Sequence, residues 1–245
     1  MTAALDAVRL ESAGSILIGG FYRAAPEDPA PAILLLHGIP GHEKNLDLAM
    51  TLRERGMHVL YFHYRGCWGS QGEYRLDHLV PDACAALTWL AGHPHVDPDR
   101  VAIVGISLGG WAALATASQS GIPRAVVALS PLLNPADPMC GEGFSLARAA
   151  EYAAPLTGIS PQDLYAQWHA LPPLASFAEG LQDLPILLIT ADRDELFPPE
   201  HYAAAPALLP RLTWQHFPRA DHLFSDVRPG LRHRVSRWLV EQLKG

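Results

Sequence analysis

Short apolar runs alternate with segments of helical spacing along most of this chain, and this alternation strongly limits the folds that it can adopt. The runs lack the polar alternation of a half-exposed sheet, so each is typical of a strand buried on both faces. In the segments between them, apolar residues recur on one helical face, as at Leu79, Ala83 and Leu87. A strand, helix, strand, helix order predicts an α/β fold with a mostly parallel central sheet and helices on both faces. The predicted strands are 33–36, 59–62, 101–104, 125–129 and 186–189.

The two ends of the chain extend this pattern. Residues 8–12 and 16–22 flank Ala13-Gly14 and predict an antiparallel hairpin before the parallel strands. Residues 213–217 predict the last strand. Leu231, Val235, Trp238, Leu239 and Leu243 then lie near one helical face, so a terminal helix should pack on the sheet.

One stretch interrupts the alternation. From about residue 134 to 183 there are two short helical patterns and no strand, divided by prolines at positions 135, 138, 155, 161, 172 and 173. Because this stretch falls between two core strands, we expect a small inserted cap over the carboxyl ends of the sheet, where open α/β folds bind ligands. Residues 1–245 are otherwise predicted to form a single domain, which is usual for this length.

Composition limits the possible partners. The formal net charge of -7 comes without a dense basic run, which argues against nucleic acid as a partner. The first residues do not resemble a secretion signal and no apolar run approaches the ~20 residues of a membrane span, so we expect a cytoplasmic protein, monomeric or homodimeric. Cys67, Cys84 and Cys140 have no paired spacing and are interpreted as free thiols. His93 and His95 lack partners at ligand spacing, so neither a metal nor a cofactor is predicted.

The most specific motif is Gly-Ile-Ser-Leu-Gly-Gly at residues 105–110, directly after one predicted strand and directly before a helical segment. This context is typical of a nucleophile held on a tight strand-to-helix turn, where small neighbours let other backbone segments pass close by. Gly105 and Gly109 supply that room. Ser107 would then stand at a helix N-terminus, which favours negative charge developing nearby. Ser107 is therefore the candidate nucleophile.

A serine hydroxyl needs a base to take its proton and a carboxylate to orient that base. After the strand at 186–189 the chain reads Thr-Ala-Asp-Arg-Asp-Glu-Leu-Phe-Pro, and after the strand at 213–217 it reads Ala-Asp-His-Leu-Phe. His222 is the histidine that follows the final strand in a short loop, with His201 as the alternative. The order of serine, aspartate and histidine is the one expected for a nucleophile of this kind.

The chain resembles the α/β-hydrolase superfamily, in particular small acyl and feruloyl-type esterases and prolyl-oligopeptidase-type catalytic domains. The resemblance covers nearly the whole chain through HGIPGHEKN at 37–45, YRGCWGSQG at 64–72, GISLGG at 105–110, TADRDELFPP at 190–199 and ADHLF at 220–224. In such families the triad acid ends a Gly-x-x-Asp pattern. Here Ala191 takes the place of the glycine, which implies Asp194, with Asp192 and then Glu195 as alternatives.

In this fold the oxyanion is bound by the backbone N–H after the nucleophile and by another from the loop after the third strand. These positions correspond to Leu108 and Ile39, and Pro40 has no N–H to offer. His37 is expected to position this loop through hydrogen bonds. The substrate pocket is predicted to include Trp68, Phe144, Trp168, Phe197 and Leu223, with the apolar cap setting substrate choice.

These residues predict a serine hydrolase that cleaves small acyl or aryl carboxylic esters through an acyl-enzyme. A peptidase or amidase of the oligopeptidase type and an acyl thioesterase are the alternatives, since all three use the same site. A binding module that has lost its nucleophile is disfavoured because Ser107, Asp194 and His222 are all present. Haloalkane dehalogenases and epoxide hydrolases need an aspartate where this chain has Ser107.

Overall fold

The computed structural model describes residues 4–25, 29–137 and 143–244. Its centre is an eight-stranded sheet with the strand order β1-β2-β4-β3-β5-β6-β7-β8. The strands are β1 Ala4–Ser12, β2 Ser15–Arg23, β3 Ala30–Leu36, β4 His58–Phe62, β5 Val96–Ile106, β6 Ala125–Leu129, β7 Ile186–Ala191 and β8 Leu212–Phe217. The strands β4, β3, β5, β6, β7 and β8 are parallel, and β2 is antiparallel to both β1 and β4. The predicted mostly parallel sheet and the N-terminal hairpin are confirmed.

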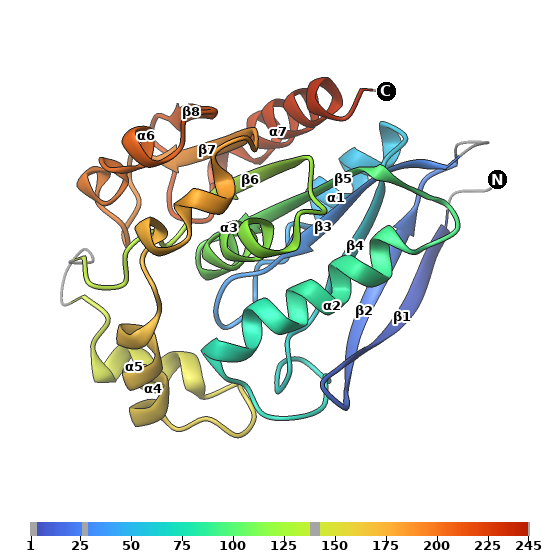
Figure 1. Ribbon diagram of the computed structural model, residues 1–245. Coiled ribbons are helices and arrows are strands. Elements are labelled where there is room, and N and C mark those ends of the chain that lie inside the picture. Colours follow the sequence, from blue (N-terminus) through green and yellow to red (C-terminus); the bar gives the residue numbers. More distant parts are fainter. Residues whose placement is uncertain (1–3, 26–28, 138–142, 245) are drawn as a thin grey trace.

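Helices cover both faces of the sheet (Figure 1). They are α1 Leu46–Glu54, α2 Leu79–Ala91, α3 Leu108–Ser120, α4 Leu146–Ala153, α5 Pro161–Ala170, α6 Ala205–Leu208 and α7 Arg228–Gln242. The side chains of β3 alternate between two apolar cores. Leu34 and Leu36 pack with α2 and α3, whereas Ile33 and Leu35 pack with α1 and α7. An apolar side chain on both faces of each central strand is therefore needed, and this explains the continuous apolar runs.

Several elements differ from the expectation, including the short helix α6, which was not predicted, and β1, which begins at Ala4 rather than at residue 8. Strand β5 begins at Val96 and not at residue 101, because the backbone of Val96 pairs with Ala30 although charged residues lie between Val96 and the apolar run. Helix α1 was not predicted. Its polar sequence buries only Leu48, Ala49 and Leu52, which is too short an apolar stripe to stand out in the sequence.

Between β6 and β7 lie α4 and α5, followed by the short 3₁₀ turns Leu174–Ser176 and Ala178–Leu181. Local signals start both helices. The hydroxyl of Ser145 accepts a hydrogen bond from the N–H of Arg148, and the hydroxyl of Ser160 accepts one from Asp163. The two helices lie beside each other at one end of the molecule, away from β1 (Figure 1). This is the segment in which the cap was expected, and Pro138 and Cys140 lie outside the described residues.

Cys67 and Cys84 are free thiols, as expected. Along the described part of the chain, no helix has both the length and the apolar character that a bilayer crossing requires.

Candidate active site

Ser107 occupies a tight turn between β5 and α3. Its backbone has φ 55° and ψ −123°, a conformation that side-chain-bearing residues rarely adopt. Hydrogen bonds hold the turn on both sides: the N–H of Ser107 donates to the carbonyl of Leu129 at 2.9 Å, and the N–H of Leu132 donates to the carbonyl of Ser107 at 3.2 Å. A strained residue kept in place by its surroundings is a feature of functional sites.

The glycines around Ser107 are required by close backbone contacts. A Cβ atom on Gly105 would lie 2.1 Å from the carbonyl oxygen of Gly109, and one on Gly109 would lie 2.4 Å from the carbonyl oxygen of Leu36. The backbone of Gly38 lies directly against Ser107, since a Cβ atom added to Gly38 would lie 3.0 Å from the Cβ of Ser107. The turn is thus wedged between β6 and the loop that follows β3, and larger residues would push it apart.

Asp194 and His222 meet although they are 28 positions apart in the sequence. Nδ1 of His222 lies 2.9 Å from each carboxylate oxygen of Asp194. The two loops that carry them follow the neighbouring strands β7 and β8 and are joined by a hydrogen bond from the N–H of Arg193 to the carbonyl of Ala220, 2.8 Å long. Adjacent parallel strands therefore bring the two loops to the same edge of the sheet.

The carboxylate of Asp194 is buried but well supported. One of its oxygens also accepts hydrogen bonds from the backbone N–H groups of Leu196 and Phe197, both 2.9 Å long. Burial by itself would raise the pKa of Asp194, but the contact with His222 and these backbone hydrogen bonds outweigh it and hold the pKa below its usual value. Asp194 is therefore ionised at neutral pH and faces the imidazole.

The alternative carboxylates are placed differently. Asp192 is exposed, lies 3.7 Å from the ring nitrogen Nε2 of His216 and accepts a long hydrogen bond from the N–H of Arg219. Glu195 touches the backbone of His222 rather than its ring, accepting the N–H at 3.0 Å. Of the three carboxylates, Asp194 is the one whose oxygens lie within hydrogen-bond distance of the imidazole of His222.

The alternative histidine, His201, is bound elsewhere. Its Nε2 accepts the N–H of Leu133 at 2.8 Å, and its Nδ1 lies 3.0 Å from the carboxylate of Asp137. Burial lowers the pKa of His201, opposed by Asp137. By contrast, Nε2 of His222 is buried and has no hydrogen-bond partner among the described residues, so it is available to another group.

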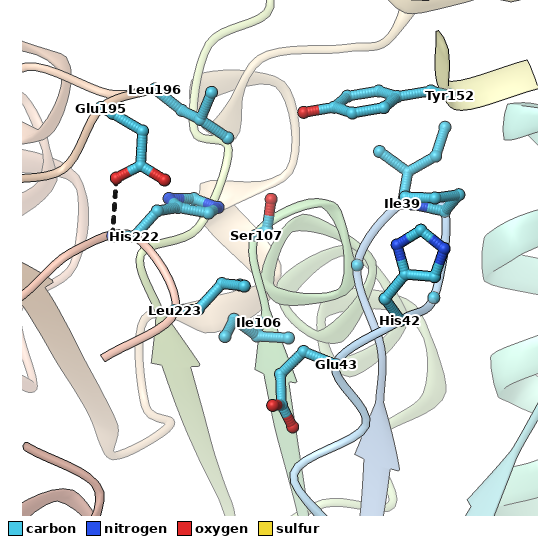
Figure 2. A pocket seen from close by; sticks show the side chains of 13 residues that line it. Ile39, His42, Glu43, Ile106, Ser107, Tyr152, Glu195, Leu196, His222 and Leu223 are labelled. Atoms are coloured by element: carbon cyan, nitrogen blue, oxygen red, sulfur yellow. Dashed lines mark hydrogen bonds between the residues drawn. The ribbon is translucent and has the colours of Figure 1, made fainter. Parts of the chain in front are cut away.

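A cavity of about 200 Å³ opens in front of Ser107. Ser107 and His222 both line it, and Figure 2 shows the serine hydroxyl and the imidazole ring turned toward the same hollow. The phenol of Tyr152, from α4, reaches over the hollow from the opposite side. The lining residues are Gly38, Ile39, Pro40, Gly41, His42, Glu43, Ile106, Ser107, Tyr152, Glu195, Leu196, His222 and Leu223.

The loop after β3 forms one wall of this cavity. Ile39 belongs to the lining, and Leu108 is the first residue of α3, directly after Ser107. The first N–H groups of a helix have no partner within the helix. His37, at the base of the loop, is buried; its Nδ1 lies 2.7 Å from the carbonyl oxygen of Gly38. Burial lowers the pKa of His37 to about 4, so this ring is neutral at pH 7.

Leu223 is the one predicted pocket residue that lines the cavity. Trp68 instead supports the loop after β3, since its indole N–H donates to the carbonyl of Pro40 at 2.7 Å. Phe144 and Trp168 stack on each other inside the segment between β6 and β7, with ring centroids 4.0 Å apart. Phe197 is buried behind the site between the rings of His201 and His222. Aromatic residues pack wherever a large apolar surface is needed, so residue type alone did not separate the pocket from its support.

Tyr152, Glu43 and Glu195 contribute to the cavity but were not predicted to line it. Tyr152 stands on α4 with the exposed Glu151 before it, and Glu195 was considered only as an alternative acid. The sequence signal that could have placed Glu195 in the cavity lining was its position directly after Asp194. Tyr152 was expected only as one of several mostly apolar cap side chains that set substrate choice, because no local pattern says which of them reaches the site. Among the described residues, no group of three or more His, Cys, Asp or Glu side chains is arranged to hold a metal ion.

Comparison with solved structures supports the fold. Est1E from Butyrivibrio proteoclasticus, solved with bound ferulic acid, has a TM-score of 0.75 with 18% identity, covering 96% of this chain and 98% of that protein. At that identity the likeness concerns the architecture only.

Sequence comparison gives closer relatives. Rv2307c of Mycobacterium tuberculosis (strain ATCC 25618 / H37Rv) is 36% identical over 132 residues, 53% of this chain and 47% of that protein. The chain thus spans about half the length of that relative. The alpha/beta hydrolase domain-containing protein WAV2 of Arabidopsis thaliana is 26% identical over 223 residues, 86% of this chain and 70% of that protein.

A family profile covers most of the chain. Residues 45–245 match the prolyl oligopeptidase family, and this range includes Ser107, Asp194 and His222. The matched range begins after the loop that carries Ile39. Together with the eight-stranded sheet, this match establishes that the chain belongs to the prolyl oligopeptidase family, within the α/β-hydrolase superfamily.

Proposed function

We propose that this chain is a serine hydrolase that cleaves carboxylic esters of small acyl or aryl type through an acyl-enzyme. The observation that carries the proposal is the Asp194–His222 pair, with 2.9 Å contacts, beside a cavity that the strained Ser107 also lines. A buried carboxylate that orients one ring nitrogen leaves the other free to take a proton. Nε2 of His222, which has no partner among the described residues, is that other nitrogen.

In the first step the Ser107 hydroxyl attacks the carbonyl carbon of the ester while Nε2 of His222 takes its proton. Asp194 stays ionised and stabilises the imidazolium that forms. The oxyanion is bound by the N–H groups of Leu108 and Ile39, aided by the N-terminus of α3. When the tetrahedral intermediate collapses, His222 gives the proton to the departing alcohol and the acyl group remains on Ser107.

In the second step a water molecule takes the place of the alcohol. His222 removes a proton from the water, the resulting hydroxide attacks the acyl carbon, and the second tetrahedral intermediate releases the carboxylic acid as the proton returns to Ser107. Each cycle consumes one ester and one water and yields one acid and one alcohol. No cofactor is needed.

Labelling and turnover together test this mechanism. An aryl fluorophosphonate should add to the intact protein at Ser107 alone, as mass spectrometry of its peptides would reveal. Ser107→Ala should lose both the label and the hydrolysis of 4-nitrophenyl acetate. An adduct at a different residue, or undiminished turnover by Ser107→Ala with an unchanged circular dichroism spectrum, would contradict the proposal.

A peptidase or amidase is the second candidate, because the family match is to prolyl oligopeptidases. Aminoacyl 4-nitroanilides compared with the corresponding 4-nitrophenyl esters separate the two activities, and acyl thioesters complete the series. After each kcat/KM is divided by the rate constant for hydroxide hydrolysis of that substrate, we expect the esters to have the highest value. The cytoplasmic location and the monomeric or homodimeric state stay predictions from the sequence.

A further inference from the structure

The charges around the cavity are unevenly distributed. Two carboxylates line it, those of Glu43 and Glu195, and its described lining contains no lysine or arginine. Figure 2 shows Glu195 beside His222 and Glu43 on the far side of Ile106 from Ser107 in that view. They come from different elements, the loop after β3 and the loop after β7.

Both carboxylates accept hydrogen bonds from the backbone. The carboxylate of Glu43 accepts the backbone N–H of Asn45, and that of Glu195 accepts the backbone N–H of His222 at 3.0 Å. These donors are uncharged, and neither carboxylate forms an ion pair with a described residue. Glu43 is half-buried, whereas Glu195 is exposed at the rim.

The nearby lysine and arginine side chains lie outside the lining and contact other groups. The ammonium group of Lys44 lies 4.9 Å from the ring centre of Trp68. Arg228 is bound to Asp47, and Arg148 contacts the hydroxyl of Tyr152. None of the three lines the cavity, although Arg148 contacts a residue that does.

Besides the two carboxylates, the ring of Tyr152 lies over the hollow (Figure 2). A cavity lined by both an aromatic ring and carboxylates is suited to a positively charged amine, including a quaternary ammonium group. The volume of about 200 Å³ is smaller than the roughly 300–1,000 Å³ of pockets that hold drug-sized ligands. The occupant should therefore be small.

From these observations we propose that the preferred substrates are small esters that carry a positively charged amine, bound between Glu43, Glu195 and the ring of Tyr152. This inference rests on the proposed ester hydrolase function and adds the charge of the substrate to it. An attraction between opposite charges near a protein surface should change kcat/KM by roughly three- to tenfold at low ionic strength. Anionic esters are disfavoured for the same reason.

Acetylcholine and 3,3-dimethylbutyl acetate form the matched pair for the test. They have nearly the same shape and differ in one atom, a charged nitrogen in the first and a neutral carbon in the second. Because the charge also makes the choline ester more reactive, each kcat/KM is divided by the rate constant for hydroxide hydrolysis of that ester. The normalised ratio should favour acetylcholine by about three- to tenfold in dilute buffer and should fall as salt is added.

Isosteric variants assign the preference to the two carboxylates. Glu43→Gln and Glu195→Gln keep an oxygen that can accept the N–H groups of Asn45 and His222 but remove the charge. Each should lower the ratio by roughly two- to threefold, mainly through KM for acetylcholine, and the double variant should bring it close to one. Glu54→Gln removes the same charge from an exposed position outside the cavity and should keep the wild-type ratio.

The possible outcomes distinguish a failure of the charge preference from a failure of the proposed hydrolase function. A normalised ratio of one in the wild-type protein, or a ratio that the double variant does not change, overturns the charge preference while ester hydrolysis stands. Hydrolysis of 4-nitrophenyl acetate with no turnover of acetylcholine also overturns it. If no ester is cleaved and Ser107 takes up no fluorophosphonate, the proposed function itself fails and the inference falls with it.

Discussion

At the scale of single residues, the environment of each carboxylate distinguishes two aspartates that lie two positions apart. Asp194 is 8% exposed and is held by the ring of His222 and two backbone N–H groups. Asp192 is exposed and accepts a long hydrogen bond from the N–H of Arg219, in the loop after β8. The preorganised, ionised carboxylate is the one that can hold the correct tautomer of the imidazole.

Replacing each aspartate by asparagine tests this difference. Asp194→Asn should lower kcat for 4-nitrophenyl acetate by roughly 10³- to 10⁴-fold, because an amide can donate to Nδ1 and thus favours the wrong tautomer. Asp192→Asn is the matched control and should retain most of the activity. If Asp192→Asn abolished turnover and Asp194→Asn did not, the assignment of the acid would be wrong.

At the scale of elements, a buried ion pair joins three parts of the chain beside the site. Asp82, on α2, is fully buried and lies 2.7 Å from Nε of Arg65 in the loop after β4. The same carboxylate accepts the hydroxyl of Ser12 at 2.7 Å, from the end of β1. The carboxylate of Asp82 therefore links α2 to the N-terminal hairpin and to the loop at 64–72.

Removing one partner of a buried pair leaves the other charge without compensation. Asp82→Ala should lower the free energy of unfolding by about 3–5 kcal/mol, measured by urea denaturation. Asp77→Ala breaks the exposed pair with Arg75 and should change stability little. Equal effects of the two substitutions would show that burial does not set the strength of this contact.

At the scale of the whole molecule, buried histidines link stability to pH. Burial lowers the pKa of His37 and of His58 to about 4 and that of His63 to about 3. Unfolding returns each ring to a pKa near 6.5, so the unfolded chain binds more protons at intermediate pH. Stability must therefore fall as the pH decreases from about 6.5 to about 4.

Thermal unfolding at a series of pH values measures this effect. We expect Tm to decrease steadily from pH 7 to pH 4, by an amount equivalent to about 1.4 kcal/mol for each pKa unit of a buried ring. His58→Asn retains an acceptor for the N–H of Ala24 and should flatten the slope between pH 6.5 and 4. A Tm that stayed constant over this range would contradict neutral buried histidines.

Much of the architecture could be predicted because its signals are local. The runs that became β3 to β7 are apolar on both faces, and Gly105-Ile-Ser-Leu-Gly lies directly between a strand and a helix. The start of β5 and helix α1 were missed because backbone pairing and a narrow buried stripe leave little trace in residue type. The strand order along the sheet also came from the structure.

The sequence by itself determined the candidates for the triad: Ser107 and His222 each follow a recognisable strand, and the family resemblance implied Asp194, with Asp192 and Glu195 as alternatives. Only the tertiary structure decided what surrounds them. Tyr152, Glu43 and Glu195 come from three separate segments and meet at one cavity, whereas Trp68 and Phe144 turned out to support loops and helices. The physical reason is that secondary structure follows from periodicity along the chain, but the lining of a cavity depends on how distant loops pack.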